Sequence, residues 1–204
     1  MATEVKMELR KRSDGVLRAI IRSVDKPIKQ MRLNRREYYE HARSYLLKAG
    51  DFREIWVEID CQGGSLDSAI GITTALCQMH QPARILIDGR CDSAGTLLLE
   101  LPAPVYITER SGIYIHSPSR ERYQRQKDGE YKLVATEKWG MKIAKKYFLV
   151  AYRIRMRQTK HKTRKKIIRG WIEDGMRFNA RQAVEAGLCD AVMSRAEFEK
   201  GAGS

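Results

Sequence analysis

The stretch from residue 53 to residue 89 constrains the fold of this chain more than any other. It reads REIWVEID, then CQGGSLDSAIGITTALCQMH, then QPARILIDG. The outer runs are rich in β-branched residues, and the middle run has apolar residues at helical spacing. A strand, a helix and a strand in this order form a βαβ unit, whose two strands are parallel because a helical crossover joins them. The chain is therefore predicted to be α/β.

Further strands and helices are predicted on both sides of this unit. Apolar periodicity and Gly or Pro breaks set their boundaries. The predicted strands cover residues 16–23, 103–109, 111–116 and 189–193, and the predicted helices cover 34–50, 94–100, 131–157 and 180–187. The long helix over 131–157 has Met141, Ala144, Phe148 and Ala151 on one face.

Length and composition predict one domain. A chain of 204 residues with 43% hydrophobic residues can bury one substantial core. No repeat, low-complexity tract or linker divides the sequence, so we expect a single domain over 1–204 with its core at about 16–195. No apolar run approaches the roughly 20 residues of a membrane span. The charged first residues lack the apolar stretch of a signal peptide. We expect a cytoplasmic protein without a membrane partner.

The formal net charge of +14 is the extreme feature of the composition. It favours anionic partners such as nucleic acid or acidic peptides and carries no information about the fold. The cations gather in residues 1–45 and 153–169. We interpret the second run as a solvated face, with a non-specific phosphate contact as the alternative. The four cysteines form no C-x-x-C pair, so neither a disulfide framework nor a metal site is predicted, and no cofactor is implied.

Two turns follow the parallel strands at the edge of the sheet where ligands gather. The first is Cys61-Gln62-Gly63-Gly64 and the second is Cys91-Asp92-Ser93-Ala94. A serine between a strand and a helix can hold its hydroxyl over the end of the sheet. If Ser93 attacks a carbonyl, the N–H groups of Gly64 and Ala94 could bind the oxyanion. The alternatives are a helix cap for the serine and a tight turn for the glycines.

His116 differs from the other histidines by its position at the end of a predicted strand, GIYIH. An imidazole near Ser93 would take the proton of the serine hydroxyl and make it a nucleophile. A histidine that caps a strand is the alternative. The remaining three histidines lie in or near predicted helices or in the basic run.

Four segments in order resemble the proteolytic subunit of the Clp protease. They are EIDCQGGSLDSAIGI, GRCDSAGTLLLE, YIHSP and ARQAVEAGLCDAV. The corresponding family motifs read approximately INSPGG, G-x-A-x-S-M-G, M-I-H-x-P and A-x-E-A-x-x-x-G-L-x-D. The spacing from the second glycine to the serine matches the family without a gap. The resemblance covers roughly residues 16–195 and is strongest from Trp56 to Pro118.

The resemblance implies a ClpP/crotonase-like fold of parallel-sheet βαβ repeats, with the 131–157 helix as a protruding handle. It implies an ATP-dependent serine endopeptidase with Ser93 as nucleophile and His116 as general base. The oxyanion hole would be formed by Gly64 and Ala94. It further implies a homo-oligomer of heptameric rings, peptide or unfolded-protein substrates, and an AAA+ ATPase unfoldase as a partner.

The acid of the family's triad has no counterpart at its expected position. An ungapped alignment places Trp171 there, within IIRGWIEDGMRFNA. We predict that Asp174 supplies the acid, with Glu173 as second choice and a dyad supported by water or a backbone carbonyl as third. Asp92, next to the nucleophile, is expected to face solvent.

Two alternative functions are suggested by features that the resemblance does not explain. A catalytically silent ring subunit is the first, because the triad acid is missing. A basic nucleic-acid-binding protein on the same scaffold is the second, because of the charge alone. The low aromatic content of the basic run argues against a stacking platform for single strands.

Overall fold

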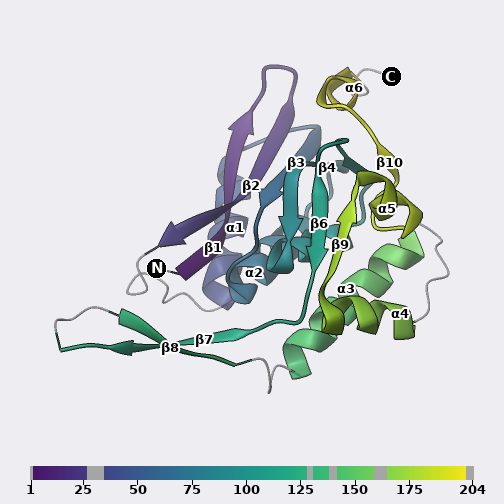
Figure 1. The fold of residues 1–204 in the computed structure, drawn as a ribbon. Coiled ribbons are helices and arrows are strands. Elements are labelled where there is room, and N and C mark those ends of the chain that lie inside the picture. Colours follow the sequence, from purple (N-terminus) through teal and green to yellow (C-terminus); the bar gives the residue numbers. More distant parts are fainter. Residues whose placement is uncertain (1, 27–34, 128–130, 138–141, 159–164, 201–204) are drawn as a thin grey trace.

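The computed structural model of the chain describes residues 2–26, 35–127, 131–137, 142–158 and 165–200 (Figure 1). Its centre is an eight-stranded mixed sheet in the order β1-β2-β3-β4-β5-β10, from which β6 branches between β4 and β9. The strands are β1 Ala2–Lys11, β2 Val16–Lys26, β3 Glu54–Cys61, β4 Ala83–Asp92, β5 Val105–Ile107, β6 Gly112–Ile115, β9 Met176–Asn179 and β10 Ala191–Val192. The α/β class predicted from the sequence is confirmed.

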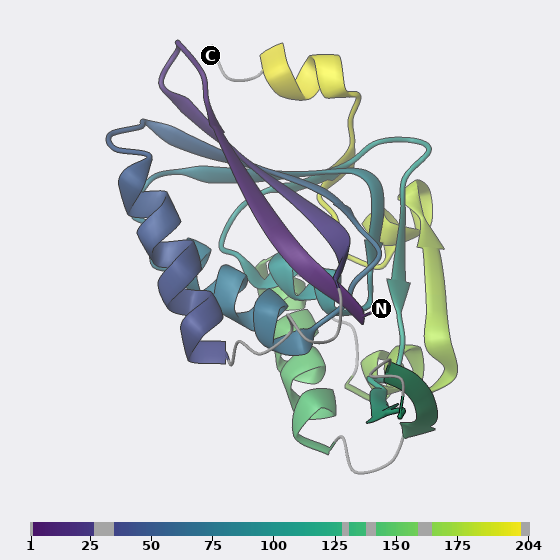
Figure 2. The same cartoon turned by 90° about the vertical axis from the view of Figure 1, so that its left-hand side faces the viewer.

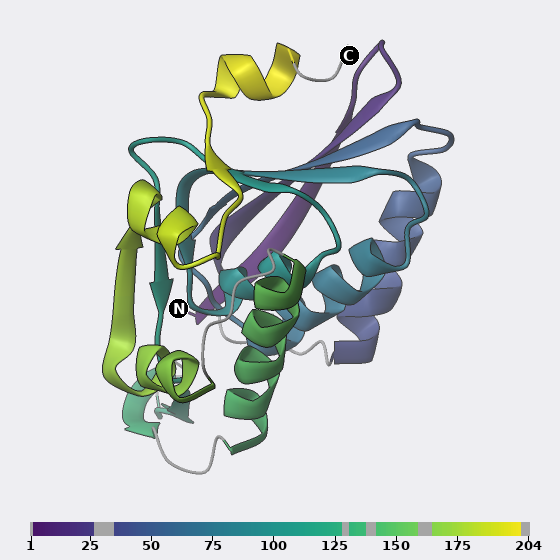
Figure 3. The same ribbon diagram turned by 90° about the vertical axis from the view of Figure 1, so that its right-hand side faces the viewer.

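Helices cover both faces of the sheet. Figures 2 and 3 show α1, α2 and α3 on one side and α6 on the other. The helices are α1 Arg35–Lys48, α2 Leu66–Cys77, the 3₁₀-helix η2 Ser93–Glu100, α3 Lys142–Gln158, α4 Lys165–Gly170, the π-helix η3 Trp171–Gly175, α5 Ala180–Glu185 and α6 Arg195–Lys200.

The parallel pairing predicted for the central βαβ unit is confirmed. Strands β3 and β4 are parallel, with Ile55 opposite Ala83 and Ile59 opposite Ile87. The strands β2, β5 and β6 also run parallel to their neighbours β3 or β4. Because these strands share a direction, the ends of β3 and β4 lie at one edge, and each leads into a helix there.

The antiparallel pair of β1 and β2 was not predicted in full, because only the second strand was recognised. Buried Val5 and Met7 alternate with the exposed or half-exposed Lys6 and Glu8. This period of two is typical of a strand with one buried face. Many charged residues fall on the other face, and they hid the pattern. The pair closes near Gly15, whose φ of +80° favours glycine.

Two apolar cores hold the layers together. The larger one lies between the sheet and helices α1, α2, η2 and α3, and includes Leu46, Ile55, Ile85, Leu98 and Phe148. The smaller one lies on the opposite face, under α6, and consists of Val16, Trp56, Leu86 and Phe198.

The prediction of one helix over 131–157 is wrong in its first part. Strands β7 Arg120–Arg125 and β8 Tyr131–Glu137 form an antiparallel hairpin, and α3 begins only at Lys142. The sequence of β8, YKLVATE, contains aromatic and β-branched residues that favour a strand when a partner is available. The hairpin extends away from the sheet in Figure 1.

Helix α3 packs against the body, with Phe148, Ala151 and Tyr152 buried. The predicted apolar face at Phe148 and Ala151 is confirmed, whereas Met141 lies outside the described residues. The solvated face expected for the basic run over 153–169 is interrupted, because Arg155 is only 1% exposed. Residues 159–164 of that run lie outside the described residues.

Within the part of the chain that the structure describes, no helix is long and apolar enough to span a lipid bilayer. The same residues contain no group of three or more His, Cys, Asp or Glu side chains placed to hold a metal ion.

Candidate active site

Ser93 lies at the junction between β4 and η2 in a strained backbone conformation. Its φ of +53° is the one positive value of a non-glycine residue in the described ranges. Such a conformation costs free energy, and structures that retain it usually do so at functional sites. The Ser93 side chain is half-exposed. The sequence prediction placed this serine in a strand–turn–helix junction, and the structure shows that junction.

Two hydroxyl groups brace the Ser93 turn. Thr96 Oγ1 donates to the Ser93 carbonyl at 2.5 Å and also lies 2.6 Å from Tyr152 Oη. Both Thr96 and Tyr152 are fully buried. Burial raises the pKa of Tyr152 well above its ordinary value, so the phenol stays neutral. Helix α3 is thereby connected to the backbone of the candidate nucleophile.

The glycine turn after β3 lies against the Ser93 turn. Gly63 and Gly64 have φ values of +91° and +139°. A Cβ atom added to Gly63 would lie 2.6 Å from Ser93 Cβ and 2.9 Å from the Asp92 carbonyl oxygen. Only glycine allows this approach together with these dihedral angles. The two turns therefore meet through Gly63, whereas the atoms nearest to Gly64 belong to Thr3 and Glu4 of β1.

Buried polar contacts below the glycine turn fix its path. The Gly63 N–H donates to Cys61 Sγ at 3.4 Å, and Ser23 Oγ donates to the Gly63 carbonyl at 2.7 Å. Burial raises the pKa of the Cys61 thiol. Cys61 is thus a neutral packing group, and the same holds for the fully buried Cys91.

His116 follows β6, and its imidazole contacts residues that are close to it in the chain. Its Nδ1 lies 2.8 Å from the Ser117 carbonyl oxygen. A carbonyl accepts a hydrogen bond, so Nδ1 carries a proton, and in the neutral imidazole the lone pair is then on Nε2. The ring stacks on Tyr114 with 4.9 Å between centroids and 22° between planes. No hydrogen bond joins His116 to Ser93 among the described residues.

The segment predicted to carry the acid reaches Tyr114 instead of His116. Strand β9 pairs with β6 so that Arg177 lies opposite Tyr114, and the Arg177 guanidinium lies 4.0 Å from the Tyr114 ring centroid. A Cβ atom added to Gly175 would lie 3.1 Å from Tyr114 Oη. The end of η3 and the start of β9 therefore support the ring on which His116 stacks.

Asp174 and Glu173 are both exposed in η3. Within the described residues neither makes a hydrogen bond to His116, and Asp174 Oδ2 lies 3.7 Å from the Cβ position of Gly170. Trp171, at the family position of the acid, packs edge-on against Phe178 with 5.0 Å between ring centroids. The structure thus shows no hydrogen bond between the predicted acid and the imidazole in the described residues.

The expectation that Asp92 faces solvent is wrong. Asp92 is only 3% exposed, and Arg90 Nε donates to Asp92 Oδ2 at 2.7 Å. Arg90, two residues earlier on the same face of the strand, supplies the compensating charge that a buried carboxylate requires.

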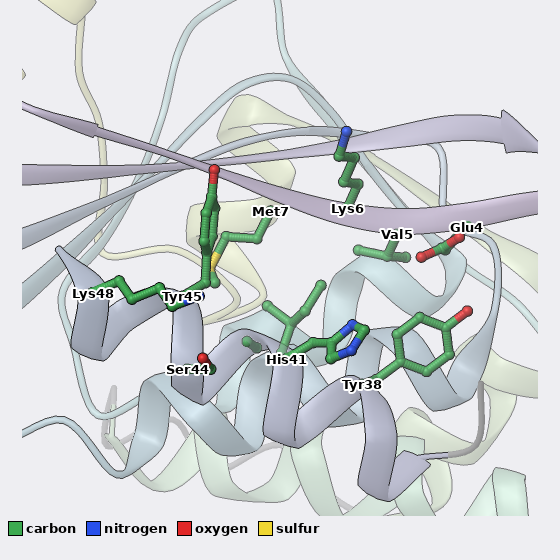
Figure 4. Close-up of a pocket in the computed structure, with 11 residues that line it drawn as sticks. Glu4, Val5, Lys6, Met7, Tyr38, His41, Ser44, Tyr45 and Lys48 are labelled. Carbon is green, nitrogen blue, oxygen red and sulfur yellow. The ribbon is translucent and has the colours of Figure 1, made fainter.

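A cavity of about 460 Å³ lies between β1 and α1 (Figure 4). Its lining includes Val5, Met7 and Ala42, with Lys6, His41 and Lys48 at its rim. None of the predicted site residues contributes to it. We therefore place the candidate site at the Ser93 turn rather than in this cavity.

Sequence reasoning missed Thr96, Tyr152 and Ser23, which fix the two turns. The Thr96–Tyr152 contact joins residues 56 positions apart, and the Ser23–Gly63 contact joins residues 40 positions apart. A local sequence pattern does not predict such pairs. The neighbouring hydroxyl in SAGT was the one available signal for Thr96.

Comparison with known proteins identifies a family whose model matches most of this chain. The family model of the Clp protease matches residues 37–196, a range that includes both turns, His116 and the β9–α5 segment. A comparison with curated proteins finds no match. Because the matched range covers most of the chain and its turns have the geometry described above, the chain belongs to the Clp protease family.

Proposed function

We propose that the protein is a serine endopeptidase in which Ser93 attacks the peptide carbonyl. The observation that carries this proposal is the strained Ser93 backbone in contact with the Gly63-Gly64 turn. A hydroxyl held over the end of a sheet beside two turn N–H groups is the arrangement that acyl transfer requires. Family membership supports the same chemistry.

The oxyanion would be bound by the N–H groups of Gly64 and Ala94. Neither N–H makes a hydrogen bond to another described residue. Both therefore remain available to the negative charge that develops on the carbonyl oxygen. Removing one such donor costs roughly 10²–10³ in kcat in other serine enzymes, so the pair is worth several kcal/mol to the transition state.

His116 would act as general base and then as general acid. Its Nε2 lone pair takes the Ser93 proton as Oγ bonds to the carbonyl carbon, and the imidazolium returns that proton to the leaving amine. Water then hydrolyses the acyl-enzyme by the same route. The hydrogen bond to Ser93 would form with substrate bound, since such bonds are often long in free enzymes.

For the third group we propose the Ser117 carbonyl in place of Asp174. It holds the Nδ1–H tautomer of His116 at 2.8 Å, which is one of the two tasks of a triad acid. It carries no full charge, so it stabilises the imidazolium less than a carboxylate does. We therefore expect turnover below that of a complete triad.

The finer assignments rest on the family. We propose peptides or unfolded polypeptides as substrates, a homo-oligomer of heptameric rings, and an AAA+ ATPase unfoldase as the partner that makes degradation ATP-dependent. The net charge of +14 favours substrates or partners with acidic surfaces. A cytoplasmic location fits the free, mostly buried cysteines.

The deciding experiment is intact mass spectrometry after treatment with a fluorophosphonate, followed by peptide mapping. We expect one adduct, on Ser93, and none in Ser93→Ala. This substitution should leave the fold intact, because loss of a capping hydroxyl costs about 1 kcal/mol. A wild-type chain that stays unlabelled while a positive-control serine peptidase reacts would favour the second candidate, a catalytically silent ring subunit that lacks its acid.

A further inference from the structure

The first strand of the chain touches the glycine turn of the candidate active site. A Cβ atom added to Gly64 would lie 2.6 Å from the Thr3 carbonyl oxygen and 3.1 Å from the Glu4 nitrogen. The next residue, Ser65, donates its N–H to the Thr3 carbonyl at 2.9 Å. The backbone of β1 is therefore packed directly against the turn whose N–H would bind the oxyanion.

A buried serine ties this contact to the first turn of α2. Ser68 is fully buried, and its Oγ accepts from the Val5 N–H at 3.1 Å and donates to the Ser65 carbonyl at 2.8 Å. One hydroxyl thus connects β1, the end of the glycine turn and the helix start. Ser65 also caps this helix, since its Oγ accepts from the Ser68 N–H.

We propose that β1 is a positioning element of the active site, an inference that rests on the proposed function. The Thr3 carbonyl holds the Ser65 N–H, and the Gly64 peptide can then turn its own N–H toward the Ser93 side. With φ at +139°, Gly64 has no side chain to restrict this peptide. The β1 backbone supplies the restriction from outside.

The proposal assigns a role to a segment that the family match does not include. The match begins at residue 37, whereas β1 spans Ala2–Lys11. Strand β1 also lies at the edge of the sheet and is paired on one side only, with β2. Its contact with the glycine turn is made by the backbone of Thr3 and Glu4, so the integrity of the oxyanion hole is linked to the docking of this edge strand.

The test compares the full chain with a variant that lacks Ala2, Thr3 and Glu4, and with Ser68→Ala. We measure kcat and KM for a fluorogenic peptide amide, and the affinity of a peptide boronate whose adduct with Ser93 places an oxygen in the oxyanion site. We expect kcat and boronate affinity to fall together, about 100-fold in the deletion and about tenfold in Ser68→Ala. KM should stay within twofold.

Thr74→Ala is the matched control. Thr74 lies on the exposed side of the same helix, and its Oγ1 donates to the Ile70 carbonyl at 2.7 Å. Its removal should change neither kcat nor boronate affinity. If Ser68 only stabilised the helix, Ser68→Ala and its control Thr74→Ala would both have lower melting temperatures. The boronate affinity per folded molecule would then be unchanged.

Hydrogen exchange at the Ser65 N–H tests the contact without any enzymatic activity. We expect slow exchange in the full chain and exchange at least tenfold faster in the deletion and in Ser68→Ala. A Ser65 amide that exchanges freely in the full chain would overturn the proposal, as would unchanged kcat and boronate affinity in either folded variant. If the full chain is not labelled by a fluorophosphonate, the proposed function fails, and the exchange result still decides whether β1 holds the turn.

Discussion

Tyr114 is the residue through which His116 is supported from the rest of the fold. Its ring contacts both the His116 imidazole and the Arg177 guanidinium, and Gly175 packs near its hydroxyl. Aromatic stacking of this kind is worth about 0.5–1.5 kcal/mol. That free energy fixes the plane of the imidazole, while the Ser117 carbonyl fixes its tautomer.

Replacing Tyr114 by leucine should therefore lower kcat about tenfold and leave KM within twofold. The reason is that an imidazole of variable orientation is less often placed to accept the Ser93 proton. Tyr114→Phe keeps the ring and should retain wild-type turnover. Tyr106→Leu is the control, since Tyr106 is a half-buried strand tyrosine that packs against Phe198. Equal losses of kcat in the Tyr114→Leu and Tyr106→Leu variants would show a general effect of stability.

Gly63→Ala should abolish labelling of Ser93 by a fluorophosphonate. The new methyl group would overlap Ser93 Cβ and the Asp92 carbonyl, and the φ of +91° adds strain of about 1–3 kcal/mol. Gly170→Ala is the control, because Gly170 has a helical φ of −56° and its added Cβ meets only Asp174 Oδ2, at 3.7 Å. Normal labelling of Gly63→Ala would mean that the two turns move independently.

Single residues were predictable where a local pattern carries them. The glycine pair, Ser93 and His116 stand at strand ends that the sequence itself marks, and the structure brings both turns together. The acid was not predictable, because its choice among Asp174, Glu173 and a carbonyl depends on the path of η3. That path is set by the pairing of β9 with β6, which no local pattern encodes.

Among the elements, α3 is anchored by a charge where the sequence suggested a solvated face. Arg155 donates to the Leu188 carbonyl at 2.9 Å, to the Ala103 carbonyl at 3.2 Å and to Asp190 Oδ2 at 2.6 Å. Asp190 Oδ2 in turn accepts from the Val105 N–H at 2.7 Å. One guanidinium thus joins α3 to the segments that precede β5 and β10.

Arg155→Met should destabilise the protein by about 2–4 kcal/mol, since buried carbonyls and a carboxylate lose their donor. Arg153→Met removes an exposed guanidinium two residues earlier on the same helix and should change the free energy of unfolding by about 0.5 kcal/mol or less. Chemical denaturation of both variants measures the difference. Similar stabilities would mean that water replaces the Arg155 contacts.

Elements with a clear apolar periodicity were predicted well. Elements that form only by pairing with another segment of the chain were not. The central βαβ unit has both its apolar period and its breaks within the local sequence. Strand β8 reads equally well as a helix until β7 is available to pair with it. The β1–β2 hairpin was hidden because charged residues crowd the exposed face of β1.

Helix α6 covers the face of the sheet opposite the larger core. Phe198 packs edge-on against Trp56 with 5.3 Å between ring centroids. Around them, Glu58 of β3 accepts from Arg18 Nη2 of β2 at 2.7 Å and from Arg195 Nη1 of α6 at 2.9 Å. This carboxylate links two strands and the last helix.

Stability should fall in acid through Glu58. Burial opposes its charge, but the hydrogen bonds from Arg18 and Arg195 prevail and hold its pKa below the ordinary value of 4.5. A pKa lowered by folding gives stability that is present above the unfolded-state pKa and is lost as pH falls through the folded-state value. The loss should therefore set in below about pH 4.5.

Denaturation of wild type and Glu58→Gln at pH 7 and pH 3 measures this contribution. Glu58→Gln should be less stable at pH 7 and should lose less stability on acidification. Glu109→Gln, an exposed carboxylate, should follow the wild-type pH dependence. A Glu58→Gln variant with the full wild-type acid loss would assign that loss to other carboxylates.

The indole of Trp56 gives this arrangement an optical signal. It is fully buried between the sheet and α6, with the guanidinium carbons of Arg84 and Arg12 at 4.3 and 4.8 Å from its ring. Its emission should be that of a dry indole close to two cations as long as α6 is docked. Release of α6 would admit water to the ring and shift the Trp56 emission to longer wavelength, so Trp56 of β3 reports whether the last helix is docked on the face of the sheet remote from the larger core.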